Sequence, residues 1–354
     1  MCSAETRARC LLDGVVGVAA TLVTVFLSIV LLRWRKVTRE HRRCFQRIEQ
    51  AGYHSDKLLR CLDKAITLSV PPVSGTNGLQ SKPLKKGLVL IGGFGDMPFM
   101  WEGLSERASK AGWYTLAPRT PGWGRIDFEE VNHVSWRDWV LACRDAVTVV
   151  RGLCTEVTVV AHSTGAPVAA LVAEILPIDR LIFTGPNFVS QASDRWAQKL
   201  LLLPIVGPLV ALCLDTVVKK KRRGRPVDNL NEAAYPTAFY LTCFPIRPLR
   251  QMWMLQSQLS RPWKVSEEVI MIMGESDGSV APLPEQVEKI QPFLPKDVPF
   301  RACSIPDAGH GLPTETERVV NTLASVVLGD MVDRLTRLAE STEEVATSQG
   351  VSGS

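Results

Sequence analysis

Residues 158–166 read Thr-Val-Val-Ala-His-Ser-Thr-Gly-Ala, and this short stretch decides the fold. A β-branched, apolar run ends at Ser163, which stands among small residues, and a helix-compatible segment follows directly. The pattern is typical of a nucleophile elbow, a sharp strand-to-helix turn that exposes a serine hydroxyl. The positions two before and two after the serine must be small, and Ala161 and Gly165 meet that need. The alternative is an ordinary serine in a loop beside a buried strand.

Length and composition allow one large domain with appendages. The chain has 354 residues, of which 46% are hydrophobic, so a sizeable core can form. The formal net charge of +5 is small for this length, and the basic residues cluster beside apolar runs, which favours a membrane surface over nucleic acid as a partner. The nine cysteines show no C-x-x-C pair and no metal-ligand spacing. We therefore expect free thiols in a reducing compartment, and no metal or organic cofactor.

The N-terminal region predicts a membrane anchor. Residues 14–32 carry no charge and are long enough to cross a hydrocarbon core of about 30 Å. Six basic residues between Arg33 and Arg43 follow this segment, whereas only Arg7 and Arg9 precede it. The positive-inside rule then predicts a single-pass membrane protein with its folded domain in the cytoplasm. The organelle stays open, with the endoplasmic reticulum as one candidate, and a buried core helix is the alternative.

The chain divides into segments by composition. Cys2, Cys10 and Cys44 lie near the predicted anchor and are candidates for S-acylation, although unmodified thiols are the simpler expectation. The expected segments are a short tail (1–13), the anchor (14–32), a basic juxtamembrane segment and linker (33–81), the first part of a core (82–186), an inserted cap (187–264), the second part of the core (265–340) and a disordered tail (341–354).

The central part of the chain alternates between two kinds of pattern. Short, continuous apolar runs of the kind found in buried parallel strands alternate with segments of helical periodicity. This alternation predicts an α/β fold with a doubly wound, mostly parallel sheet. The expected strands are 87–91, 113–118, the run before Ser163, 180–184, 269–274 and 300–305, and the clearest helices are 101–110 and 138–153.

Four motifs follow in the order of the α/β-hydrolase fold: Ile-Gly-Gly-Phe-Gly at 91–95, Ala-Pro-Arg-Thr-Pro-Gly-Trp-Gly at 117–124, Trp-Arg-Asp-Trp at 136–139 and Ala-His-Ser-Thr-Gly at 161–165. Together they resemble the branch of monoacylglycerol lipases and bacterial carboxylesterases, over roughly residues 84–330. The chain departs from that branch at Gly92 and Trp123, where histidine is common, and at Ala161. The histidine missing before Gly93 leaves open what supports the loop at that position.

A serine nucleophile needs a base, and the base needs a carboxylate that holds its tautomer. In this fold the chain order is serine, acid, histidine. His310 is the one histidine after Ser163, which makes it the candidate base. Asp277 follows the apolar run 269–274 and matches the family's position for the acid, with Glu275 and Asp307 as rivals.

The resemblance also implies a site for the negative charge that develops on the ester oxygen. Its donors are the backbone N–H groups of Phe94 and Thr164, and this assignment rests on the family. We expect His162 to pack behind the site and not to serve as the base.

The segment between Thr184 and Val269 is far longer than an ordinary connection, which predicts an inserted cap. Within it, the apolar run 200–212 is too short for a second membrane span, and the basic run 219–225 follows. We expect residues 200–225 to form a lid that dips into a membrane interface. The alternatives are a buried cap helix with a solvated basic loop, or a basic tract that resembles a nuclear-import signal.

These features predict a membrane-anchored serine hydrolase that cleaves carboxylic esters of apolar acyl chains, monoacylglycerol-like lipids above all. The predicted partners are a lipid or other acyl-ester substrate and the membrane, with no nucleic acid, and the oligomeric state stays open. An acyltransferase or an acyl-protein thioesterase would share the same three residues. A non-catalytic interaction module with the hydrolase fold is the third reading.

Overall fold

The protein is described by a computed structural model in which residues 66–69, 84–123, 129–213, 216–218 and 243–329 are placed, together with four isolated positions nearer the N-terminus. Those four, Gly17, Thr21, Thr24 and Ser28, are helical and fall inside the predicted anchor. Over the placed part of the chain, no helix is both long and apolar enough to cross a membrane. Several predicted segments lie outside the described residues, so those predictions stay untested: the tail 1–13, the rest of the anchor, nearly all of 33–81, the basic run 219–225 and the tail 341–354.

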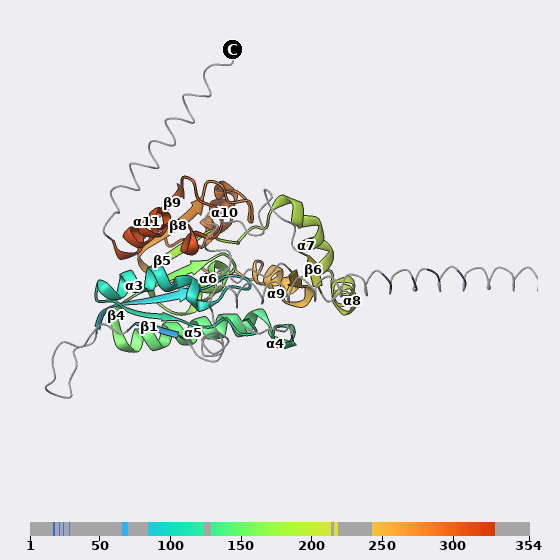
Figure 1. Ribbon diagram of the computed structural model, residues 1–354, viewed down its shortest axis with the longest axis horizontal. Helices are drawn as coiled ribbons and strands as arrows, with labels where there is room; N and C mark the ends of the chain where they lie inside the picture. Colours follow the sequence, from blue (N-terminus) through green and yellow to red (C-terminus); the bar gives the residue numbers. More distant parts are fainter. Residues whose placement is uncertain are drawn as a thin grey trace, which may run out of the picture.

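A seven-stranded sheet forms the centre of the molecule (Figure 1), and its strands follow one another in the order β1-β3-β2-β4-β5-β8-β9. All neighbours are parallel except β1, which pairs antiparallel with β3. The predicted mostly parallel sheet is therefore confirmed, and β1 is the strand that the sequence did not predict. The strands are β1 (Ile66–Ser69), β2 (Leu84–Ile91), β3 (Tyr114–Ala117), β4 (Cys154–His162), β5 (Ile178–Thr184), β8 (Val265–Gly274) and β9 (Phe300–Ile305).

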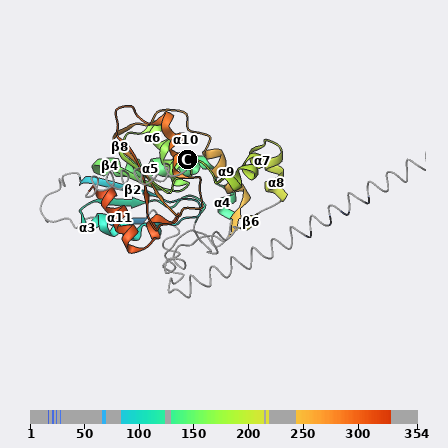
Figure 2. The same ribbon diagram turned by 90° about the horizontal axis from the view of Figure 1, so that it is seen from above.

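Helices cover both faces of the sheet (Figure 2), which explains why its central strands read as continuous apolar runs. On one face, α3 (Glu102–Lys110) and α11 (Glu317–Leu328) pack through residues such as Leu104 and Leu323. On the other, α5 (Trp136–Leu153) and α6 (Gly165–Ile175) bury Val147 and Ala169. The shorter helix α10 (Leu283–Ile290) buries Ile290 in the same cluster as α5 and α6, and α4 (Glu129–His133) is a short helix that precedes α5.

The start of α5 shows how the sequence sets a helix boundary. Ser135 and Asp138 form a capping box, in which the Ser135 amide donates to the Asp138 carboxylate at 2.8 Å. This hydrogen bond satisfies a backbone donor that would otherwise lack a partner. The helix therefore begins at Trp136, two residues earlier than its apolar periodicity suggests.

An insertion lies between β5 and β8, as expected. It contains α7 (Arg195–Leu202), α8 (Val206–Cys213), the antiparallel pair β6 (Thr216–Val218) and β7 (Cys243–Pro245), and α9 (Ile246–Leu255). The helices α7, α8 and α9 lie together at one end of the molecule in Figures 1 and 2. The limits 187–264 given to the cap stay a prediction.

The apolar run 200–212 forms two helices and not one. Leu203, which precedes Pro204, has extended backbone angles (φ −60°, ψ 134°), as expected before a proline, and α7 ends there. Leu201 and Ala211 are buried, whereas Leu200, Leu203 and Ile205 are 38%, 46% and 74% exposed. This run is therefore partly core and partly surface.

The order of the strands fixes where a site can form. Strand β2 pairs with β3 on one side and with β4 on the other, so the chain reverses its direction across the sheet between β2 and β4. In open α/β sheets, ligands bind at such a switch point, beyond the carboxyl ends of the strands. The loop after β2 and the turn after β4, which carry residues 92–96 and Ser163, meet at this point.

Candidate active site

Ser163 occupies the sharp turn between β4 and α6. Its φ of +51° lies in the left-handed region that residues other than glycine rarely adopt. Two hydrogen bonds hold this conformation: the Ser163 amide donates to the Thr184 carbonyl at 3.0 Å, and the Asn187 amide donates to the Ser163 carbonyl at 3.1 Å. Strained backbone of this kind persists where the surroundings enforce it, and it clusters at functional sites.

The turn requires a glycine at one flank and tolerates a methyl group at the other. A Cβ on Gly165 would lie 2.6 Å from the Gly92 carbonyl oxygen and 2.8 Å from that of Ile91. Ala161 sits fully buried in β4, paired with Ile91 on β2 and with Phe183 on β5, and its methyl group is accommodated. The replacement of the family's first glycine by alanine therefore leaves the turn intact.

The structure joins the three candidate residues by two hydrogen bonds. The Ser163 Oγ atom lies 2.9 Å from His310 Nε2, and His310 Nδ1 lies 2.8 Å from Asp277 Oδ2. An ionised carboxylate can only accept, so Nδ1 carries the proton and Nε2 presents a lone pair to the serine hydroxyl. Such an arrangement allows the imidazole to take a proton from the serine.

The two rival acids stay away from the imidazole. The Asp307 side chain is 87% exposed and faces Arg318 at 3.4 Å, and Glu275 is exposed. Asp277 is almost completely buried, with a side chain 1% exposed. Of the three acids weighed from the sequence, Asp277 is the one that contacts His310.

The loops that carry Asp277 and His310 are tied to each other. The Ser276 amide donates to the Ala308 carbonyl at 2.9 Å. A Cβ on Gly274 would lie 2.2 Å from the Gly309 carbonyl oxygen, so this close approach requires glycine. The distance from acid to base is thus fixed by backbone contacts as well as by the side chains.

Charge and burial act in opposite directions on Asp277. Burial disfavours its charged form, but the charge and hydrogen bond of His310, together with a hydrogen bond from the Ser279 amide, outweigh burial and hold the pKa of Asp277 below its usual range. The carboxylate is therefore ionised at neutral pH and can orient the imidazole.

His162 lies behind the site, as expected. Its ring centroid is 4.9 Å from that of His310, and its Nδ1 donates to the Thr184 carbonyl at 2.8 Å. Burial, and then the nearby charge of His310, lower the pKa of His162 to about 3. The ring stays neutral at physiological pH and packs against the residue that takes the base position.

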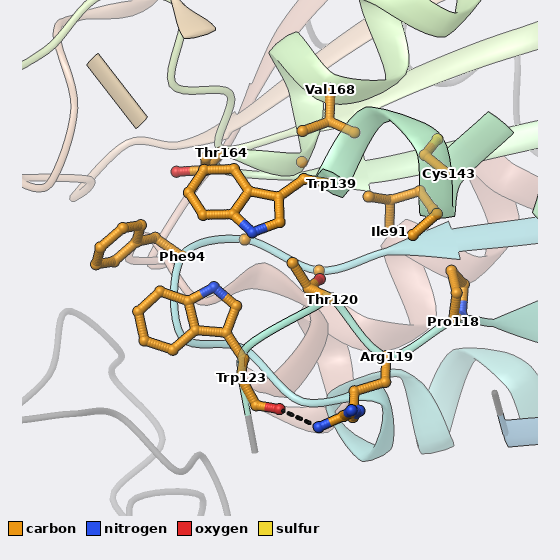
Figure 3. Close-up of a pocket in the computed structure, with 14 residues that line it drawn as sticks. Ile91, Phe94, Pro118, Arg119, Thr120, Trp123, Trp139, Cys143, Thr164 and Val168 are labelled. Carbon is orange, nitrogen blue, oxygen red and sulfur yellow. Dashed lines mark hydrogen bonds between the residues drawn. The ribbon is translucent and has the colours of Figure 1, made fainter. Parts of the chain in front are cut away.

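Phe94 and Thr164, the proposed backbone donors, line one pocket beside Ser163 (Figure 3). Thr164 directly follows the serine at the start of α6, where amides point outward and the helix dipole favours negative charge. Phe94 follows Gly93, whose backbone approaches the nucleophile so closely that a Cβ there would lie 2.7 Å from Ser163 Cβ. Three of the residues that line the pocket are aromatic, Phe94, Trp123 and Trp139, and their rings lie near one another in Figure 3.

Asp96 is a residue of the site that the sequence reasoning did not single out. It is 7% exposed and accepts the Gly93 amide at 2.7 Å, while its own amide donates to the Gly93 carbonyl at 3.3 Å. Gly95 makes the turn possible with a φ of +84°. A Cβ on Gly92 would lie 3.0 Å from Asp96 Cβ, so the Asp96 side chain fills space beside the position where the family has histidine. An aspartate three residues after Gly93 in a glycine-rich turn was the available signal.

Glu315 plays a comparable part on the histidine loop. It is 3% exposed, and its carboxylate accepts the Gly309 amide at 2.8 Å. This bond holds the backbone directly before His310. No motif marks Glu315, because its role depends on the fold of residues 306–315.

No group of three or more histidine, cysteine, aspartate or glutamate residues within the placed ranges could hold a metal ion.

Comparisons with known proteins bear on the family and the fold of the chain. The sequence profile of the Alpha/beta hydrolase family matches residues 88–322, well over half of the chain. The thermostable monoacylglycerol lipase of Bacillus sp. (strain H-257) is 26% identical over 107 residues, which cover 30% of this chain and 42% of that relative. The chain thus aligns with less than half the length of this relative.

Two solved structures show the same fold. A soluble variant of the monoglyceride lipase from Saccharomyces cerevisiae superposes with a TM-score of 0.52 at 16% identity, covering 72% of this chain and 88% of that one. The Paleococcus ferrophilus monoacylglycerol lipase gives a TM-score of 0.52 at 16% identity, covering 69% and 93%. The family match agrees with the elbow, with the strand order and with the order of serine, acid and histidine along the sequence. This chain belongs to the alpha/beta hydrolase family.

Proposed function

We propose that the protein is a serine hydrolase that cleaves carboxylic esters of apolar acyl chains, with monoacylglycerol-like lipids as the leading substrate class. The observation that carries this proposal is the continuous hydrogen-bonded chain from Ser163 through His310 to Asp277, with distances of 2.9 and 2.8 Å. Ser163 stands on an elbow with left-handed backbone angles, at a switch point of the sheet.

In the first half of the proposed reaction, Ser163 Oγ attacks the ester carbonyl carbon while His310 Nε2 takes its proton. The tetrahedral intermediate collapses with cleavage of the ester C–O bond, and the imidazolium gives the proton to the leaving alcohol. Asp277 keeps Nδ1 protonated and stabilises the imidazolium. The acyl group is then bound to Ser163 as an ester.

In the second half, a water molecule replaces the alcohol. His310 takes a proton from the water, the hydroxide attacks the acyl-enzyme, and Ser163 leaves with that proton, which releases a carboxylic acid. The Phe94 and Thr164 amides would stabilise the negative oxygen in both halves. For one such donor the contribution is about 2.7–4 kcal/mol.

The apolar acyl chain is inferred from the lining of the site. Phe94, Trp123 and Trp139 surround the pocket next to the nucleophile, and the Phe94 and Trp123 ring centroids are 4.6 Å apart. The names of the relatives point to the same class of substrate, since three of them are described as monoacylglycerol or monoglyceride lipases.

Attachment to a membrane is a second part of the proposal. On the cap, Trp196 and Ile205 are 70% and 74% exposed, and Leu200 and Leu203 lie close to them in the sequence. We call these four residues the cap patch. The basic run 219–225 follows in the sequence and suits anionic headgroups. We infer that the cap patch contacts a lipid bilayer to which residues 14–32 anchor the chain, on its cytoplasmic side.

The substrate class is tested with the full chain in detergent. We expect release of free fatty acid from 1-monoacylglycerols, faster for long than for short acyl chains, and none from the His310→Ala variant. An S-acylated peptide and glycerol as an added acyl acceptor are run in parallel. Faster turnover of the peptide, or acyl transfer to glycerol in place of hydrolysis, would favour the thioesterase or the acyltransferase. A folded protein that turns over none of these would leave the interaction module as the better reading.

The membrane contact is tested with a double variant, Trp196→Ser with Ile205→Ser. We expect slower hydrolysis of monoacylglycerol in vesicles of phosphatidylcholine and phosphatidylserine, with unchanged hydrolysis of a water-soluble short ester. Val149→Ser is the matched control, because Val149 is an exposed apolar residue of α5, outside the cap. Equal effects of both changes on the vesicle substrate would contradict the contact.

Extraction of the full chain from membranes by alkaline carbonate would contradict the anchor.

A further inference from the structure

The hydroxyl group of Thr164 has no hydrogen-bond partner among the residues that the structure describes. Its Oγ1 atom is fully covered, and the residue is 3% exposed. Buried polar side-chain atoms in proteins nearly always have a partner, so an exception calls for an explanation. Seven such atoms occur in the described part of the chain, and the Thr164 hydroxyl is the one on the residue that directly follows Ser163.

The hydroxyl does not serve the helix either. Thr164 is the N-cap residue of α6, and a threonine there usually accepts an amide of the first turn through its side-chain oxygen. That bond is missing, because Thr164 has helical backbone angles (φ −63°, ψ −22°) and not the extended ones of a capping residue. A structural role as a cap is therefore ruled out for this side chain.

The surroundings of Thr164 point to a ligand. Thr164 lines the pocket of Figure 3 with Phe94 and Trp139, and Gly92 and Gly93 of the loop after β2 line the same pocket. Two other polar groups of this region are already bound: Trp139 Nε1 donates to the Pro121 carbonyl at 3.1 Å, and Arg119 Nη1 donates to the Trp123 carbonyl at 3.1 Å. A substrate placed against Ser163 would bring a carbonyl oxygen next to Thr164.

We propose that the Thr164 hydroxyl is a third donor to the ester carbonyl oxygen, beside the backbone amides of Phe94 and Thr164. Two of the three staggered rotamers of threonine place the hydroxyl next to the residue's own amide, so both groups can donate to one acceptor. An oxyanion has lone pairs for three donors, and its full charge makes each bond stronger in the tetrahedral state than in the ground state. This inference rests on the proposed function and adds a catalytic residue to it.

A pair of substitutions isolates the hydroxyl. Thr164→Val keeps the shape and removes the O–H group, whereas Thr164→Ser keeps the O–H group and removes a methyl. We expect Thr164→Val to lower kcat by about 10-fold or more, with little change in KM, and Thr164→Ser to stay within a few-fold of the native protein. The affinity for a trifluoromethyl ketone, which forms a tetrahedral adduct with an oxyanion, falls by the same factor in Thr164→Val. The affinity for an unreactive ether analogue does not change.

The Tm distinguishes this catalytic role from a structural one. If the hydroxyl stabilised the free protein, its removal would lower the Tm. Because the hydroxyl has no partner in the free protein, Thr164→Val keeps or raises the Tm. A native kcat in Thr164→Val, or a lowered Tm, would overturn the inference. The failure of this inference can be told apart from the failure of the proposed function. If only the inference fails, the native protein still hydrolyses esters and Ser163→Ala does not. If the proposed function fails, the native protein is itself inactive.

Discussion

Gly93 and Asp96 hold each other across a four-residue turn: the Gly93 amide donates to the Asp96 carboxylate at 2.7 Å, and the Asp96 amide donates back to the Gly93 carbonyl at 3.3 Å. Phe94, one of the two proposed backbone donors, lies between them in this turn, together with Gly95. The loop that the family supports with a histidine at position 92 is thus fixed in this chain by an aspartate from within the turn. A buried carboxylate that accepts a backbone amide makes a strong, charge-assisted hydrogen bond.

Asp96→Ala should therefore lower kcat by about 10-fold to 100-fold, because the Phe94 amide loses its fixed position. Asp96→Asn keeps a side-chain oxygen that can accept the Gly93 amide, and we expect it to restore most of the rate. The measurement is kcat per active site, counted by fluorophosphonate labelling, with KM recorded in parallel. If Asp96→Ala lowers only the number of labelled sites and each remaining site turns over normally, Asp96 acts on folding alone.

Asp277→Asn should lower kcat by about 10⁴-fold, since an amide leaves the imidazole in the wrong tautomer. Asp307→Asn and Glu275→Gln are matched controls, because both residues are exposed and lie on neighbouring loops. Ester hydrolysis by the three variants decides among the three acids. A loss of activity in Asp307→Asn or Glu275→Gln that equals the loss in Asp277→Asn would contradict the assignment.

His162 should make the protein less stable in acid. Its pKa of about 3 in the folded state lies below the 6.5 of a free histidine, so between these values the unfolded chain binds a proton that the folded chain excludes. Proton uptake by His162 in the unfolded chain leaves the free energy of unfolding unaffected above about pH 6.5. As the pH falls toward about 3, it lowers that free energy by up to about 1.4 kcal/mol per pH unit.

Urea unfolding of the native protein and of His162→Gln at pH 7 and pH 5 measures this effect. Glutamine can still donate to the Thr184 carbonyl but does not titrate. We expect the native protein to lose about 2 kcal/mol more than the variant between the two pH values. Equal losses would show that His162 is not held neutral by its surroundings.

Much of the fold and of the site could be predicted because each feature has a local cause. The strands of the sheet are covered on both faces, so they appear in the sequence as continuous apolar runs. The order of serine, acid and histidine, and the small residues beside Ser163, follow from the steric demands of the elbow. The structure then brings Ser163, Asp277 and His310 into contact as that order suggests.

Other features could not be predicted because they depend on contacts between distant segments. Strand β1 is a four-residue edge strand whose pairing with β3 leaves no periodic signal. Asp96 and Glu315 are carboxylates whose roles arise from the backbone amides that the loops bring to them. The missing partner of the Thr164 hydroxyl is a property of the packed pocket and has no sequence pattern at all.

Fluorophosphonate labelling tests the central claim most directly, because the probe reacts only with an activated serine. The native full chain, Ser163→Ala, His310→Ala and a control variant, Ser257→Ala, are compared after folding is checked by circular dichroism. Ser257 lies on the exposed surface just after α9. The account predicts rapid labelling of the native protein and of Ser257→Ala, and none of Ser163→Ala or His310→Ala. A folded native protein that does not label, or a Ser163→Ala variant that labels at the native rate, would contradict it.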